Sequence, residues 1–208
     1  FISYRHSDNR QPGRQWANWL HHALETYEVP ADLIGTVNQR GETIPERIFP
    51  VFRDEEELPA DAELSRPIRQ ALGNSLFLLV LCSPHAVASR FVAEEITIFK
   101  QAKPGNQDRV LAAIIAGDPL GVEVGADQAT PDIPCEARQC FPRPLRFKPD
   151  HQGTLSDQPA EPIAADFRLP DGREGFSSPA AYRAYLKGSG GADAGSVSQS
   201  VAEYPRRL

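Results

Sequence analysis

The chain has 208 residues, 40% of them hydrophobic and 24% charged, which is typical of a globular protein with one domain, or one domain and an appendage. Its net charge of −6, without any run of Lys or Arg, disfavours nucleic-acid binding. The longest apolar run, 76–82, is far shorter than the ~20 residues that span a bilayer, so we expect no membrane contact. The cysteines have no zinc-like spacing and no export signal is present, which favours a metal-free protein of the cytoplasm.

The first half of the chain alternates between strand and helix patterns. Residues 1–4 predict a short strand, and residues 16–27 carry one apolar stripe at helical spacing. A second strand is predicted over 48–52, either at or near a sheet edge or bulged, because Pro50 has no N–H to donate. A further helix is expected to end at Gly73.

Two continuous apolar runs, 76–82 and 110–115, predict central parallel strands that helices cover on each side. Between them, Ser89 is expected to cap a helix that reaches about Gln101. The alternation as a whole predicts a doubly wound α/β domain.

The signal weakens after about residue 120, where Pro, Gly, Asp and Ser dominate. We expect a short strand near 144–147, short helices at 160–168 and 182–186, and a linker at 188–195. The chain is therefore divided into a domain over 1–150 and a loop-rich extension, or linker to a further region, over 151–208.

Glu95 is out of place in the predicted helix over 91–101. At about 100° per residue it falls near the centre of the apolar face, whereas Glu94 falls toward the edge. A carboxylate there is costly unless it is paired, protonated or at a cleft. The helix follows the carboxyl end of the third strand, where open parallel sheets bind ligands.

Two interpretations of Glu95 stay open: a partner of a buried Arg or a group over the rim of the core, and a carboxylate facing a ligand crevice. The second would place Glu95 opposite side chains from the loops after the first two strands: Tyr4, Arg5, Asp8, Arg53 and Asp54.

Four segments, taken in order, resemble motifs of the TIR domain family. They are FISYRHSD at 1–8, FRD at 52–54 with its acidic loop, LVLCSP at 79–84, and SRFVAEEI at 89–96. The last contains an aromatic residue, three intervening residues and a Glu. The resemblance covers residues 1 to about 119 and implies a flavodoxin-like open parallel sheet with helices on both faces.

The resemblance also implies an enzyme. In catalytic members the Glu of the last segment is the essential acid, and it matches Glu95. We therefore expect an NAD+ glycohydrolase that cleaves the nicotinamide–ribose bond to give ADP-ribose or a cyclic variant, with NAD+ as substrate and no metal or other cofactor. The residues expected to contact the substrate are Ser3, Tyr4, Arg5, Asp8, Arg53, Asp54, Ser83 and Phe91.

The resemblance further implies contact with other copies of the domain through the 53–62 loop, and a role in bacterial antiphage defence that self-assembly activates. Two departures are visible: Phe91 replaces a frequent Trp, and Asp61 stands where the loop often has Gly. The alternative function is a non-catalytic TIR–TIR scaffold. A receiver-type domain is disfavoured because the third strand ends in Cys82-Ser83 and not in a phospho-acceptor Asp.

Overall fold

A parallel β-sheet forms the centre of the protein. The computed structural model describes residues 1–10, 15–53, 66–103, 105–123, 133–134, 137–150, 154–168 and 179–189. Its four-stranded sheet has the order β1-β2-β3-β6, and every neighbouring pair is parallel. The strands are β1 (Ile2–Ser3), β2 (Leu78–Cys82), β3 (Val110–Ile114) and β6 (Ile163–Asp166).

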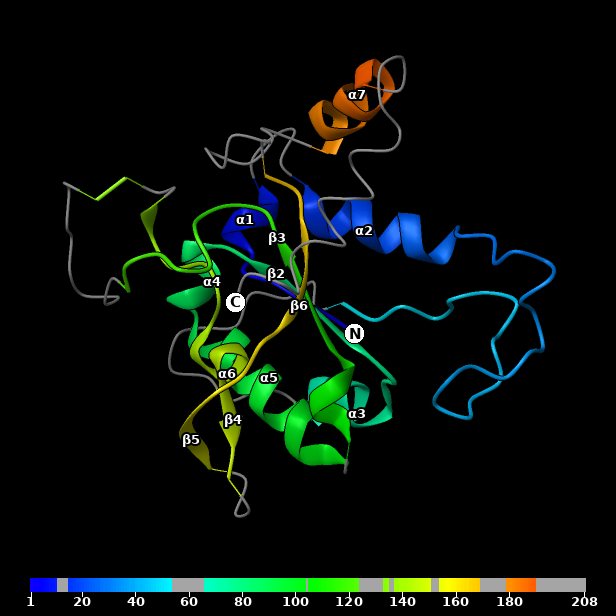
Figure 1. Cartoon of the computed structure of the whole chain (residues 1–208), viewed down its shortest axis with the longest axis horizontal. Helices are drawn as coiled ribbons and strands as arrows, with labels where there is room; N and C mark the ends of the chain where they lie inside the picture. The colour runs from blue at the N-terminus through cyan, green and yellow to red at the C-terminus, as the bar shows by residue number, and fades with distance from the viewer. Residues whose placement is uncertain are drawn as a thin grey trace.

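Helices cover both faces of this sheet, as predicted (Figure 1). One face packs against α3 (Arg66–Asn74), α5 (Arg90–Ala102) and the short α6 (Arg143–Arg146). The other packs against α2 (Trp16–Glu25), with α7 (Pro179–Ser189) beside it. Because successive strand residues point to opposite faces, Val80 belongs to the first core and Leu81 to the second.

The prediction of a regular strand over 48–52 is wrong. Residues 48–52 form no strand, and as far as this segment is described, to Arg53, it pairs with the sheet through a parallel bridge between Ile2 and Arg53. The Ile2 amide donates to the Phe52 carbonyl at 2.8 Å. Pro50 cannot contribute a ladder hydrogen bond, which limits the pairing. The position of this segment at the edge of the sheet, beside β1, is confirmed. If the five segments are numbered along the chain, with the Arg53 segment as the second, their order across the sheet is 2-1-3-4-5, as in flavodoxin-like folds.

The helix predicted at 160–168 is also wrong, since this segment contains β6. Its residues pair in register with β3, from Leu111 opposite Ile163 to Ile114 opposite Asp166. The sheet thus takes its fourth strand from the segment assigned to the extension. Pairing with an existing strand outweighs the helix propensity of two alanines, Ala164 and Ala165.

The predicted strand near 144–147 is replaced by α6 over most of its length. It is followed by β4 (Phe147–Pro149), which pairs antiparallel with β5 (Leu155–Pro159) in a separate two-stranded sheet. The helix predicted at 182–186 is confirmed and is longer than expected, as α7. In the part of the chain that the structure describes, no helix is both long and apolar enough to cross a bilayer.

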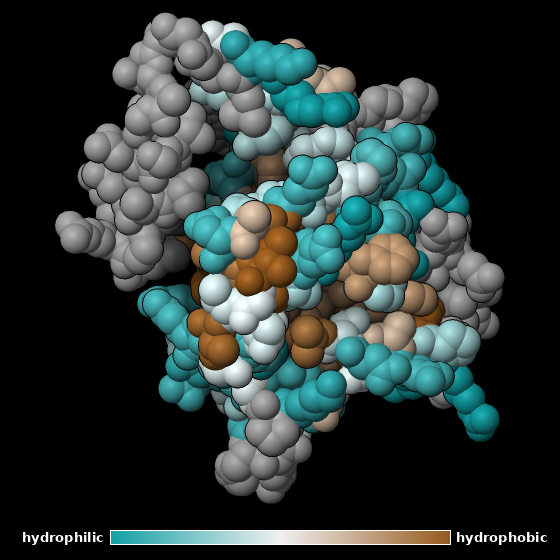
Figure 2. All heavy atoms as spheres, turned by 90° about the vertical axis from the view of Figure 1, so that its right-hand side faces the viewer, coloured by the Kyte–Doolittle hydropathy of each residue, from teal (hydrophilic) through white to brown (hydrophobic). Residues whose placement is uncertain are grey.

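A long connector between α2 and Arg53 projects from the body, at the right of Figure 1. It is fastened at the amino end of β3: the Arg40 guanidinium donates to the Asp108 carbonyl at 2.9 Å, and Glu42 pairs with Arg109. Figure 2 faces this side and shows apolar side chains at the surface. The exposed ones include Tyr27, Leu33, Ile34, Val37, Ile48, Phe49, Phe52, Leu76 and Phe77.

Candidate active site

The candidate site lies where the connections of the sheet change direction. From β1 the chain goes outward to the edge at Arg53, and it then returns to β2 on the other side of β1. In an open parallel sheet, a ligand crevice lies at such a switch point, outside the carboxyl ends of the two strands. Ser3 ends β1 and Ser83 follows β2, so both stand at this edge.

Glu95 points inward at this edge. It lies on α5, whose N-cap Ser89 accepts a hydrogen bond from the Val92 amide. Only 5% of Glu95 is exposed, and the Ser3 hydroxyl donates to its Oε2 atom at 2.5 Å. The prediction that Glu95 occupies the buried face of its helix is confirmed.

Glu94 lies about 100° around the helix from Glu95, toward the edge of the buried face. Its carboxylate pairs at 2.7 Å with the Arg69 guanidinium from α3, and both side chains are partly exposed. The structure therefore separates the two adjacent glutamates as the helical periodicity predicted: one carboxylate in a surface ion pair and one inside the fold.

A second serine–carboxylate pair lies beside the first. Asp8 is on the short helix α1 (Ser7–Arg10), and the Ser83 hydroxyl donates to its Oδ2 atom at 2.5 Å. The Ser83 hydroxyl also accepts from the Ala86 amide at 3.0 Å and so caps α4 (Pro84–Val87). This pair joins the segment after β1 to the end of β2.

Two predicted aromatic contacts approach this edge from opposite faces of the sheet. Tyr4 is buried on the α2 side, with its ring edge-on to His6 at 5.2 Å. Phe91 is half-buried and packs against the core on the α5 side. Arg5, between Tyr4 and His6, is also half-buried.

Arg53 is tied to helix α2. Its guanidinium donates to the side-chain carbonyl of Asn18, which also accepts from the Asn9 amide group at 2.8 Å. Arg53 thus links the sheet edge to the helix above it. Asp54 lies outside the described residues, as does most of the 53–62 loop, so those two predictions stay predictions.

The model of the TIR domain family matches residues 1–131. This chain belongs to the TIR domain family. No curated protein and no solved structure matches it. The matched region contains both serine–carboxylate pairs and ends before α6, β6 and α7, so one strand of the sheet and two of the helices that cover it lie beyond the match.

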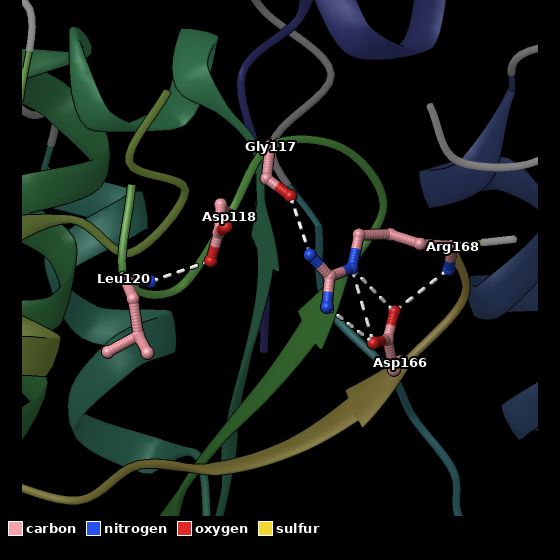
Figure 3. Close-up of polar contacts among 5 residues, drawn as sticks. All are labelled: Gly117, Asp118, Leu120, Asp166 and Arg168. Carbon is pink, nitrogen blue, oxygen red and sulfur yellow. Dashed lines mark hydrogen bonds and ion pairs between the residues drawn. The ribbon is translucent and has the colours of Figure 1, made fainter. Parts of the chain in front are cut away.

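Arg168 lies at the same carboxyl edge of the TIR domain, and sequence analysis did not single it out (Figure 3). It follows β6, donates from Nε and Nη2 to the two oxygens of Asp166, and donates from Nη1 to the Gly117 carbonyl at 2.8 Å. Its side chain is 9% exposed. The sequence predicted a helix at 160–168 and therefore gave no reason to place Asp166 and Arg168 beside the end of β3. It is the pairing of β6 with β3 that brings them there.

The two cysteine thiols that the structure describes, Cys82 and Cys140, are buried. Burial raises the pKa of Cys82 well above its ordinary value and raises that of Cys140 to about 12. A thiol held protonated in this way is a poor nucleophile. Nor do the described residues include any group of three or more His, Cys, Asp or Glu side chains placed to hold a metal ion. Two described carboxylates at the switch point, those of Glu95 and Asp8, are each bonded to a serine.

Proposed function

We propose that this TIR domain is an NAD+ glycohydrolase and that Glu95 is its catalytic carboxylate. One observation carries the proposal. Glu95 is a buried carboxylate at the switch point of the sheet, and the other buried residues on its face of α5 are apolar and pack in the core. Burying such a group without a function costs stability, so a buried acid at a ligand-binding edge favours a catalytic role.

The proposed reaction breaks the N-glycosidic bond of NAD+. Nicotinamide leaves with the bonding electron pair, and positive charge develops on the ribose in an oxocarbenium-like transition state. The Glu95 carboxylate stabilises that charge. Water then adds a hydroxyl group to the anomeric carbon and releases a proton, which gives ADP-ribose; attack by a group of the substrate itself in place of water would give a cyclic product.

The neighbouring residues supply contacts for the rest of the substrate. Tyr4 would form a wall of the pocket, and Phe91 would pack beside the nicotinamide ribose. Arg5 would contact a phosphate or amide, and Asp8 would anchor its loop. Arg53 and Asp54 are proposed contacts from the edge segment. Assembly of several copies through the 53–62 loop would complete the site, and depletion of NAD+ in the cytoplasm would serve antiphage defence.

The test is the turnover of NAD+ by concentrated protein, with and without a crowding agent. We expect release of nicotinamide together with ADP-ribose or its cyclic form, and loss of that release in Glu95→Ala. Intact NAD+ at every concentration would refute the enzyme and favour the scaffold.

A further inference from the structure

Two serine–carboxylate hydrogen bonds cross the switch point in opposite directions. In one, Ser3 of β1 donates to Glu95, which follows β2 in the chain. In the other, Ser83 after β2 donates to Asp8, which follows β1. Each bond therefore joins the β1 side of the site to the β2 side: the donor stands at the end of one strand, and the carboxylate lies on a helix that comes after the other strand.

Neither hydroxyl is available to a substrate in this arrangement. Ser3 is 1% exposed and Ser83 is fully buried. Ser83 already donates to Asp8 and accepts from Ala86, which uses its one donor and one of its acceptor positions. The hydroxyls of these two serines are therefore better placed to hold the two carboxylates than to contact the substrate directly.

We infer that Ser3 and Ser83 are positioning residues: Ser3 fixes the Glu95 carboxylate, and Ser83 fixes, through Asp8, the segment that carries Tyr4 and Arg5. This inference rests on the proposed function for its catalytic consequence. The physical basis is that a hydroxyl bonded to a carboxylate makes a short, charge-assisted hydrogen bond with a defined direction. Glu has three rotatable side-chain bonds, so such a bond selects one position for the reacting oxygen.

The two serines should differ in their kinetic effect. Without the Ser3 hydroxyl, the Glu95 carboxylate loses the bond that fixes its Oε2 atom in the position needed in the transition state, so kcat falls by roughly ten- to a hundredfold with a small change in KM. Without the Ser83 hydroxyl, the Tyr4–Arg5 segment loses the bond from Asp8 to the end of β2, and the main change is a higher KM. Asp8→Asn should resemble Ser83→Ala.

The experiment compares Ser3→Ala, Ser83→Ala and Ser89→Ala in the full chain. Ser89 is a matched control, because it is a buried serine at the start of the helix that carries Glu95, and its hydroxyl bonds an amide and not a carboxylate. Ser89→Ala should lower the unfolding midpoint and leave both kcat and KM unchanged. Ser3→Thr keeps a hydroxyl and should recover part of the lost kcat.

Wild-type kinetics of Ser3→Ala and Ser83→Ala would overturn the inference, and so would equal losses in all three variants. Failure of the proposed function is distinct, because it shows as intact NAD+ with the wild-type protein.

A second readout needs no turnover. If Ser3 holds Glu95, the double variant Ser3→Ala/Glu95→Gln is destabilised by less than the sum of its single changes. Strict additivity would overturn the Ser3 contact whether or not the protein cleaves NAD+.

Discussion

Replacing Gly117 by alanine should destabilise the protein more than the same change at Gly105. Both glycines have positive φ angles, +82° at Gly117 and +83° at Gly105. A Cβ atom at Gly117 would lie 2.8 Å from the Arg138 carbonyl oxygen and 2.9 Å from the Pro84 ring, whereas one at Gly105 would meet nothing within 4 Å. A backbone carbonyl and a proline ring cannot rotate away as a flexible side chain can. The backbone itself must therefore shift to relieve the contact.

The magnitudes separate the two variants. The left-handed backbone costs an alanine roughly 1–2 kcal/mol at either position. Overpacking adds about 1–3 kcal/mol at Gly117 alone, which gives a total of about 2–5 kcal/mol. For a protein of this size each kcal/mol lowers Tm by roughly 2–4 °C. Because Pro84 adjoins Ser83, the shift should also disturb the anchor of Asp8.

The assay is guanidinium unfolding of wild type, Gly117→Ala and Gly105→Ala, with the slopes compared as well as the midpoints. Equal losses of stability in the two variants would refute the reasoning, since they would leave only the shared backbone cost. The tight contact between the end of β3 and the start of α4 would then not be rigid.

Two further predictions concern the aromatic core around Phe167 and the titration of Lys100. Phe167 contacts Trp16, Trp19 and Tyr182 at ring-centroid distances of 5.4, 6.0 and 5.0 Å. Phe167→Ala should lower the free energy of unfolding by about 2 kcal/mol, because the ring is half-buried. The control Leu120→Ala, at a residue that is 79% exposed, should lower it by under about 0.5 kcal/mol. Thermal unfolding measures both. Burial lowers the pKa of Lys100 from 10.5 to about 8. Between these values the unfolded chain binds the extra proton, so wild type should gain stability relative to Lys100→Met as pH rises from 8 to 10. Parallel stability curves for the two proteins, measured by denaturant unfolding, would contradict this.

The features that sequence predicted best are local ones. The helix starting after Ser89 and the inward position of Glu95 follow from a cap and a periodicity within one segment. The two strands at 76–82 and 110–115 follow from continuous apolar runs, because a strand buried on both faces has no polar side to show.

What sequence could not predict depends on contacts between distant segments. Ser3 and Glu95 are separated by 92 positions, and Ser83 and Asp8 by 75, so no local pattern links them. The segment at 163–166 has two alanines that favour a helix, and only its pairing with β3 makes it a strand. That error also concealed the Arg168–Asp166 pair.

The adjacent glutamates provide the most direct test of the central claim. Glu95→Gln and Glu94→Gln make the same chemical change on neighbouring residues of one helix, one buried beside Ser3 and the other paired with Arg69 at the surface. The measurement is the initial rate of nicotinamide release from NAD+ by each purified variant and by wild type. We predict that Glu95→Gln loses at least about a hundredfold in rate while Glu94→Gln stays close to wild type. Equal rates in the two variants, or a wild-type rate in Glu95→Gln, would contradict the assignment of Glu95 as the catalytic carboxylate.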